Sequence, residues 1–244
     1  YNNAGTLEFL VDRGGNHYFI EMNPRIQVEH TITEMCTGID LVRSQILVAE
    51  GYELSDEMIG IKSQEDIKQN GYAIQCRITT EDPSNNFAPD TGKITSYFSP
   101  GGFGVRLDGA TSGVGSVISP YYDSLLVKIT CWDNTFKNAC KKTLRAIQEI
   151  RISGVKTNIG FISNILTNPT FIEGKCHTKF IDETPELFNL DNGEEKSTKM
   201  LKYIATKTLA ESGHHKRYDK IRMPELTGNK PDGLKQLLDS KGPK

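Results

Sequence analysis

Apolar and polar residues alternate in several short stretches of the chain, and this period-two pattern predicts β-strands. Polar residues 13–16 lie between the first two stretches and predict a hairpin turn, which makes those strands antiparallel neighbours. A later stretch alternates just as regularly, with Ile74 on one face and Arg77 on the other. Strands are expected at residues 6–12, 17–23, 72–80, 93–98 and 105–109, and within 120–132.

Apolar residues spaced three or four positions apart predict helices. Val42, Ile46 and Ala49 follow this spacing, and Gly51 is expected to end their helix. In the clearest helical stretch, Asn134 is the expected N-cap. Helices are therefore expected around residues 42–49, 134–150 and 157–166, the last ending before an Asn-Pro pair.

The composition of the chain changes after residue 190. Residues 191–199 are charged and predict a linker, whereas residues 200–210 form an amphipathic stretch. Residues 214–222 concentrate basic charge, for which a solvated connector is the ordinary interpretation. The alternative is a docking site for an anionic effector or a neighbouring domain. Residues 234–239 are expected to begin a short helix.

Composition excludes several classes of protein. With 244 residues and a net charge of −2, the chain gives no support for non-specific nucleic-acid binding. It has no apolar run of membrane-spanning length and no signal-peptide pattern. Its five cysteines are odd in number and form no C-x-x-C pair, which indicates a reducing compartment. A strand-like run stands close to the first residue, so we expect a segment of a longer polypeptide.

Five polar residues occupy every second position of one short stretch: Glu21, Asn23, Arg25, Gln27 and Glu29. In an extended chain this spacing places all five side chains on one face. Carboxylate and amide oxygens suit Mg²⁺, and an arginine among them suits an oxyanion such as phosphate or bicarbonate. A half-buried strand with its polar face in water is the alternative, although such faces favour Thr, Lys and Ser.

Two further positions bear on this interpretation. If the first two strands pair, Glu8 approaches Glu21, and adjacent carboxylates repel each other unless a cation lies between them. This juxtaposition favours a metal site. Arg77 lies in the middle of a strand, and an unpaired guanidinium is costly to bury. Position alone therefore favours an exposed arginine at the rim of the sheet.

Several long blocks of sequence, in order along the chain, resemble the C-terminal half of biotin carboxylase, the ATP-grasp unit of the biotin-dependent carboxylases. These blocks are residues 5–12, 17–35, 71–83, 92–109 and 120–129. Farther along, the stretches at 156–174, 180–188 and 198–205 resemble the region that joins this domain to the rest of a multidomain carboxylase.

The resemblance implies an α+β fold in three parts. Residues 1–55 would form the C-terminal part of an ATP-grasp domain. Residues 56–190 would form the biotin carboxylase C-terminal domain, a mostly antiparallel sheet with packed helices. Residues 191–244 would be a linker and the start of an allosteric interdomain region. The family's glycine-rich lid and its biotinyl lysine have no counterpart here, so we expect this segment to be inactive alone.

The resemblance also implies roles for individual side chains on the nucleotide side of the site. Glu8, Glu21 and Asn23 correspond to residues that hold the Mg²⁺ (or Mn²⁺) ions bridging the phosphates of ATP. Glu29 corresponds to the general base that deprotonates bicarbonate. These roles agree with a face that carries both acceptor oxygens and a base.

Further matches concern bicarbonate and biotin. Arg25 corresponds to the arginine that binds bicarbonate, together with Gln27 and the backbone of Val28. Arg77 corresponds to the arginine that binds the ureido oxygen of biotin and stabilises its enolate form. Biotin would be covalently attached to a carrier domain of the same polypeptide. The implied function is ATP- and bicarbonate-dependent carboxylation of biotin.

Other family properties follow from the same resemblance. Biotin carboxylase units pair as dimers, here within an expected tetramer, and Arg106 and Asp123 are candidates for the dimer interface. Acetyl-CoA is an expected allosteric activator near the domain junction. No nucleic-acid or membrane partner is expected. The expected compartment is a bacterial cytoplasm, or the mitochondrial matrix if the protein is eukaryotic.

Three alternatives remain open at this stage. The first is the biotin carboxylase part of an acyl-CoA carboxylase, against which the stretch at 180–188 argues. The second is a non-catalytic dimerisation module whose polar face binds nothing. The third is an ATP-grasp ligase for another acid, which would lack a role for Arg77.

Overall fold

An antiparallel hairpin opens the computed structural model, which describes residues 1–109, 113–190 and 196–211. Its strands are β1 (Thr6–Val11) and β2 (His17–Asn23). The turn between them is held by Asp12, whose carboxylate accepts the N–H groups of Gly14 and Asn16. In this register Glu8 pairs directly with Glu21, as the predicted hairpin requires.

Two short helices follow the hairpin: α1 (His30–Thr37), which the sequence pattern did not predict, and α2 (Leu41–Ala49). Helix α1 ends at Gly38, whose left-handed conformation (φ 76°) is easily adopted by glycine. Asp40 caps α2 by accepting the Arg43 N–H. Gly51 follows α2 with a positive φ, in agreement with the predicted end of this helix.

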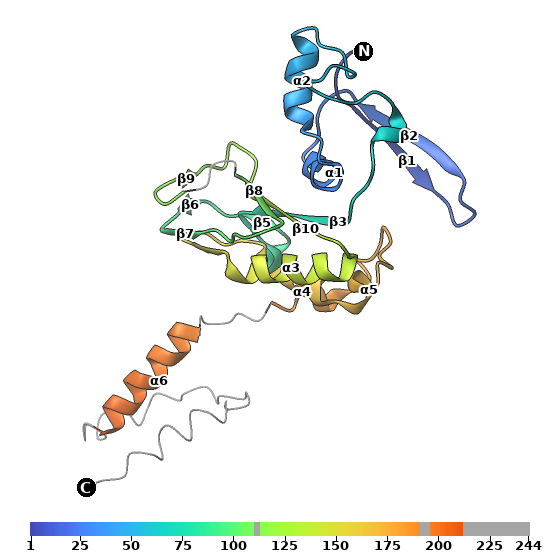
Figure 1. Cartoon of the computed structure of the whole chain (residues 1–244). Helices are drawn as coiled ribbons and strands as arrows, with labels where there is room; N and C mark the ends of the chain where they lie inside the picture. The colour runs from blue at the N-terminus through green and yellow to red at the C-terminus, as the bar shows by residue number, and fades with distance from the viewer. Residues whose placement is uncertain (110–112, 191–195, 212–244) are drawn as a thin grey trace. The chain divides into compact units, whose positions relative to one another are not determined.

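After the two short helices, a three-stranded antiparallel sheet forms the centre of the fold from residue 72 to residue 190 (Figure 1). Its strand order is β3 (Tyr72–Thr79), β10 (Leu125–Asp133) and β8 (Val105–Gly109). Alternate residues of β3 are buried or exposed, with Ile78 fully buried and Arg77 on the opposite face, as predicted. Because β3 stands at one end of the strand order, it is an edge strand of this sheet.

Helices α3 (Phe136–Glu149) and α4 (Ile159–Thr167) provide the other side of the core. Thr135 caps α3 by accepting the Asn138 N–H, so the predicted N-cap at Asn134 was wrong. The fully buried core side chains come from β3, β10, α3, α4 and the segments between them. They include Ile78, Leu126, Ile129, Ile147, Ile150 and Leu166.

Short elements complete this unit and were mostly not predicted. The strands form the pairs β4 (Glu81–Asp82) with β5 (Ala88–Pro89), β6 (Gly92–Lys93) with β9 (Val117–Ile118), and β7 (Ser96–Phe98) with β11 (Arg151–Ser153). Helix α5 spans Pro169–Ile172, and 3-10 helices span Gln64–Asp66, Pro83–Asn85 and Pro185–Phe188. All strand pairs in the described residues are antiparallel, so the predicted α+β class is confirmed.

The chain divides into two units, residues 1–191 and residues 192–244. Within the second unit, α6 (Lys196–Glu211) is described. It begins four residues before the amphipathic stretch at 200–210, so the linker predicted for 191–199 was too long. The basic stretch at 214–222 and the helix expected at 234–239 lie outside the described residues. No helix among the residues described is both long enough and apolar enough to cross a membrane.

Candidate active site

The hairpin brings together the acidic pair and the amides that were predicted from spacing. Asn23 donates to Glu8 (3.0 Å) and to Glu21 (3.1 Å), and so lies between the two carboxylates. Gln27 also donates to Glu8, at 3.1 Å. Four of the predicted side chains therefore form one connected cluster of carboxylates and amides at the end of the hairpin.

Beyond Asn23, the extended chain predicted for this stretch was wrong. Strand β2 ends at Asn23, and the Arg25 N–H turns back to bond the Asn23 carbonyl at 2.8 Å. The physical reason is Pro24, which has no N–H to donate to a ladder and whose ring fixes φ. Gln27 and Glu29 therefore do not extend the face of β2. They lie on a segment that turns after Asn23, and this turn brings Gln27 back to Glu8.

Arg25 is an exposed cation in this segment. Its guanidinium donates to the carbonyl of Ile26, its neighbour, at 3.3 Å. In the described part of the chain it forms no ion pair. A guanidinium without a carboxylate partner can bind a planar oxyanion through two parallel N–H bonds.

Arg77 reaches the same region from β3. Its Nη2 lies 2.9 Å from Oε2 of Glu29, and both side chains are about half exposed (52% and 51%). The contact joins residues 48 positions apart in the sequence. Because solvent-exposed ion pairs contribute only about 0–1 kcal/mol, either group can leave the pair for a ligand at little cost.

Side chains of β3 and β10 hold the segment that carries Glu29 against the sheet. The Val28 carbonyl accepts Gln75 Nε2 (2.9 Å) and Lys128 Nζ (3.2 Å). Gln75 also donates to the Thr31 hydroxyl (2.5 Å), which bonds the buried Thr130 hydroxyl at 2.7 Å. Since two donors already occupy the Val28 carbonyl, a bicarbonate contact from Val28 would use its N–H. The sequence reasoning missed this support, although Gln75 shares a strand face with Arg77.

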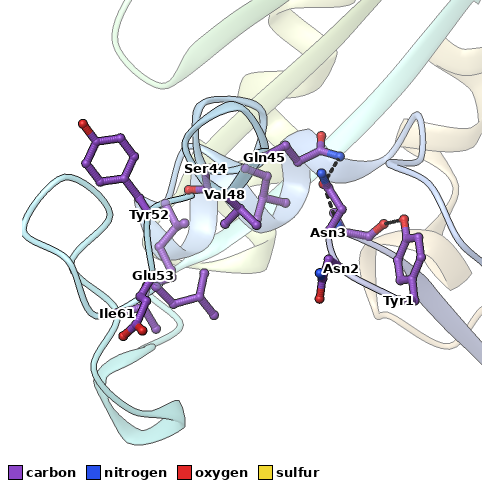
Figure 2. Close-up of a pocket in the computed structure, with 13 residues that line it drawn as sticks. Tyr1, Asn2, Asn3, Ser44, Gln45, Val48, Tyr52, Glu53 and Ile61 are labelled. Atoms are coloured by element: carbon purple, nitrogen blue, oxygen red, sulfur yellow. Dashed lines mark hydrogen bonds between the residues drawn. The ribbon is translucent and has the colours of Figure 1, made fainter. Parts of the chain in front are cut away.

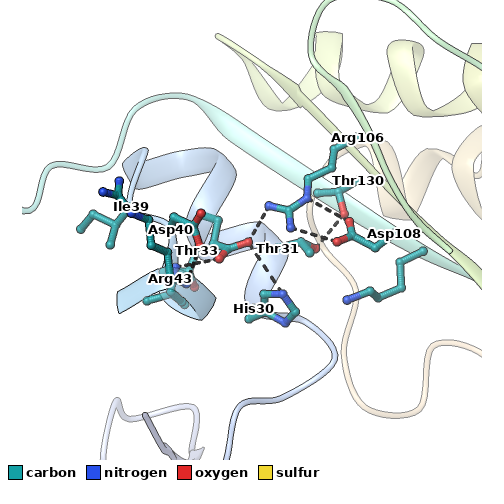
Figure 3. Close-up of polar contacts among 12 residues, drawn as sticks. His30, Thr31, Thr33, Ile39, Asp40, Arg43, Arg106, Asp108 and Thr130 are labelled. Atoms are coloured by element: carbon teal, nitrogen blue, oxygen red, sulfur yellow. Dashed lines mark hydrogen bonds and ion pairs between the residues drawn. The ribbon is translucent and has the colours of Figure 1, made fainter. Parts of the chain in front are cut away.

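Helix α1 has a second attachment, to β8 (Figure 3). Arg106 donates to the buried carboxylate of Glu34 at 2.5 Å and forms a two-point contact with Asp108 at 2.9 Å. The Leu41 N–H donates to the other Glu34 oxygen, and His30 Nε2 lies 3.7 Å from Glu34. The Asp108 carboxylate raises the pKa of the Arg106 guanidinium.

These contacts bear on the two predicted interface residues. Arg106 is turned toward Glu34 and Asp108 of its own chain, with its side chain 33% exposed. Asp123 is exposed and lines a small cavity of about 270 Å³ with Glu81 and Asp90. Neither placement tests a dimer interface, so that role stays a prediction.

The described residues offer a donor set that fits Mg²⁺ and bicarbonate. Mg²⁺ is commonly bound by one or two carboxylates plus substrate phosphates, and Glu8 and Glu21 supply two carboxylates on paired positions. No group of three His, Cys, Asp or Glu side chains within reach of one metal occurs in the described residues. Among the buried side-chain nitrogen and oxygen atoms of the described residues, Gln27 Oε1 is the one without a hydrogen-bond partner. An amide oxygen in this state can accept the O–H of a bicarbonate.

A larger cavity of about 550 Å³ lies elsewhere, between the first residues and α2 (Figure 2). Tyr1, Asn3, Gln45 and Tyr52 line it, and the Gln45 amide donates to Asn3 at 2.7 Å. It shares no residue with the predicted site. The predicted site therefore does not lie in this cavity.

Comparisons with known proteins agree with these features. The family described as "Biotin carboxylase C-terminal domain" matches residues 75–183, and "Carbamoyl-phosphate synthase L chain, ATP binding domain" matches residues 1–57. Pyruvate carboxylase from Bacillus subtilis is 52% identical over 99% of the chain, which spans only 22% of that relative. Related pyruvate carboxylases occur in bacteria and in fungi.

Two solved structures show the same fold. The biotin carboxylase domain dimer of Hydrogenobacter thermophilus 2-oxoglutarate carboxylase, in complex with MgADP and bicarbonate, is 48% identical (TM-score 0.73; 78% of this chain, 40% of that chain). Pyruvate carboxylase from Rhizobium etli, with the allosteric activator acetyl coenzyme A, is 50% identical (TM-score 0.78; 83% and 20%). Residues 75–183 therefore belong to the biotin carboxylase C-terminal domain family, and the chain resembles, over 99% of its length, the corresponding region of a pyruvate carboxylase.

Proposed function

We propose that this chain is part of a pyruvate carboxylase and carries residues for its first half-reaction, the ATP- and bicarbonate-dependent carboxylation of biotin. The observation that carries the proposal is the contact of Glu29 with Arg77 at 2.9 Å. It joins the predicted base for bicarbonate to the predicted guanidinium for biotin. The full-length carboxylase that this proposal implies is called the parent enzyme below.

On the nucleotide side, Glu8, Glu21 and Asn23 would hold Mg²⁺, in agreement with their clustering at the hairpin. Bound Mg²⁺ would neutralise phosphate charge on ATP. Arg25 would bind bicarbonate as an oxyanion, with Gln27 and the N–H of Val28 as further contacts. Glu29 would accept the proton of bicarbonate, which would then attack the terminal phosphate of ATP, so that the bond to ADP breaks and carboxyphosphate and ADP form.

On the biotin side, Arg77 would donate to the ureido oxygen and offset negative charge there. Carboxyphosphate would break down to CO₂ and phosphate, the phosphate would take the proton of the ureido nitrogen of biotin on its carrier domain, and that nitrogen would then bond the CO₂. When Arg77 turns to biotin, its contact with Glu29 opens. The two residues thus act at neighbouring points of one surface.

The remaining assignments rest on the relatives. Carboxyl transfer to pyruvate, which yields oxaloacetate, is proposed because the curated relatives are pyruvate carboxylases. A dimer of biotin carboxylase units and activation by acetyl-CoA are proposed by analogy with the two solved structures. The tetramer is proposed from the family resemblance of the sequence. The proposed domain limits are residues 1–55, 56–190 and 191–244, and the proposed compartment is the bacterial cytoplasm or the mitochondrial matrix.

The test follows fixation of labelled bicarbonate by the parent enzyme with ATP and Mg²⁺. Pyruvate, 2-oxoglutarate and an acyl-CoA are compared as acceptors, each with and without avidin. We expect avidin-sensitive fixation that depends on pyruvate. Avidin-sensitive fixation into another acceptor would keep the biotin carboxylase site and reject pyruvate, and no effect of avidin would reject the site.

A variant pair locates the biotin step. Arg77→Ala should abolish biotin carboxylation while bicarbonate-dependent ATP cleavage is retained. Arg145→Ala is the matched control, because Arg145 forms a similarly half-exposed ion pair with Glu149 at 2.8 Å on α3. Equal activities of the two variants would contradict the role assigned to Arg77.

A further inference from the structure

Strand β3 carries Arg77 at the free edge of its sheet, and one side chain takes the place of the missing neighbouring strand. That residue is Asn158. Its Oδ1 accepts the Thr79 N–H at 3.0 Å, and its Nδ2 donates to the Arg77 carbonyl at 2.9 Å. The Asn158 N–H also donates to the Thr79 carbonyl, at 3.3 Å.

This arrangement copies a β-ladder. In a parallel pair, one residue of the partner strand donates to the C=O of residue i and accepts from the N–H of residue i+2. The amide of Asn158 supplies the same acceptor and donor from a single side chain. The backbone on either side of Arg77 is therefore held at both edges, by β10 through its pairing with Lys128 and by Asn158.

Asn158 does this instead of a more ordinary task. It is the N-cap residue of α4, a position where asparagine side chains usually accept a backbone N–H of the first turn. Here the side chain makes no capping bond, and the residue is only 8% exposed. A buried amide with both its oxygen and its nitrogen bonded to β3 fixes that strand in one register with α4.

The guanidinium of Arg77 depends on this backbone. Its side chain is 52% exposed, and its guanidinium forms the ion pair with Glu29. Little side-chain packing therefore defines its place, and the Cα position of Arg77 sets where the guanidinium can reach. Small displacements of a binding group, of about 1 Å, can cost about a hundredfold in rate.

We propose that Asn158 is a positioning residue for the biotin step, acting through the backbone of Arg77. This inference rests on the proposed function and deepens it, because it names a residue outside the cluster that contacts substrates. Its signature is a selective loss: Asn158 should matter for the use of biotin and not for the bicarbonate-dependent cleavage of ATP, which uses the hairpin and the Glu29 segment.

The experiment uses the parent enzyme with Asn158→Ala and Asn158→Asp. The aspartate variant retains an acceptor for the Thr79 N–H but loses the donor to the Arg77 carbonyl, so it keeps one of the two side-chain bonds. Free biotin is titrated at saturating ATP and bicarbonate, and ATP cleavage without biotin is measured in parallel. Thermal unfolding reports whether each variant is folded.

For both variants we expect kcat/KM for biotin to fall about tenfold or more, with biotin-independent ATP cleavage within about twofold of wild type. Asn164→Ala is the matched control. Asn164 lies on the same helix and donates to the Leu187 carbonyl at 2.9 Å, away from β3. We expect it to leave both activities near wild type.

Parallel loss of both activities in the Asn158 variants would overturn the inference, since it would show a general structural role. Unchanged use of biotin in a folded Asn158→Asp enzyme would overturn it as well. Failure of the wild-type parent enzyme to carboxylate biotin would instead reject the proposed function on which the inference rests, and the wild-type assay separates these two results.

Discussion

The contact between Arg106 and Glu34 gives a quantitative prediction about how helix α1 is held. Glu34 has a side chain only 6% exposed, and Arg106 donates to it at 2.5 Å. Arg106→Met removes this partner and leaves a buried carboxylate that still accepts the Leu41 N–H at 2.7 Å. The substitution keeps most of the aliphatic volume of the arginine, so the lost charge and hydrogen bond dominate the effect.

The magnitude follows from the burial of the two partners. Removing one partner of a buried ion pair costs about 3–5 kcal/mol, and a retained backbone donor together with an arginine that is 33% exposed reduces this to about 2–3 kcal/mol. Glu34→Gln in the same background removes the unpaired charge. The double variant should therefore be more stable than the sum of the single effects predicts, by about 1–2 kcal/mol.

The assay is urea unfolding of the chain followed by fluorescence of Trp132, its single tryptophan. Trp132 belongs to β10, and its indole N–H donates to the Asn70 carbonyl at 2.7 Å, so its environment changes when the sheet opens. Arg145→Met is the control, because its pair with Glu149 is about half exposed and should contribute less than about 1 kcal/mol. Additive single effects, or an Arg106→Met chain as stable as the control, would refute the reasoning.

Three further outcomes are expected. Gly154→Ala should destabilise the chain by more than about 3 kcal/mol in the same urea assay, because Gly154 has a φ of +101° and an added Cβ would lie 2.1 Å from the Lys93 carbonyl oxygen. Gly101→Ala is the control and should change stability little, because its Cβ would meet nothing within 4 Å. Equal effects of the two substitutions would contradict this reasoning. Burial raises the pKa of Cys76 to about 12, so a thiol reagent at pH 8 should modify the exposed Cys176 and spare Cys76 until the chain unfolds. Rapid labelling of Cys76 in the folded chain, mapped by mass spectrometry, would contradict the burial argument. The raised pKa also makes the free energy of unfolding depend on pH. Because the unfolded chain loses the Cys76 proton first, stability that is present below pH 9 should decline as pH rises from about 9 toward 12.

Local sequence signals were sufficient where one short stretch determined the outcome. The turn at residues 13–16 predicted the hairpin, and the hairpin predicted that Glu8 and Glu21 are opposite each other. Period-two burial in β3 placed Arg77 on the open face. In each case neighbouring residues alone determine the geometry, through pleating or through the turn.

Local signals failed where one residue overrides a pattern or where distant segments meet. Pro24 ends a strand that the alternation of polar residues predicts to continue as far as Glu29. The bond between Thr31 and Thr130 joins positions 99 apart, and that between Asn158 and the Arg77 carbonyl joins positions 81 apart. Periodicity carries no information about such contacts, so the support of the site could be found only in three dimensions.

Two consecutive residues in the candidate site are attached to different elements. Gln27 is bonded to Glu8 of the hairpin, whereas the Val28 carbonyl is bonded to Gln75 of the sheet. Their Cα atoms are joined by one trans peptide, which cannot stretch beyond about 3.8 Å. This peptide therefore acts as an inextensible tether between the hairpin and the sheet. As long as both hydrogen bonds hold, the end of the hairpin and strand β3 cannot move apart at this point.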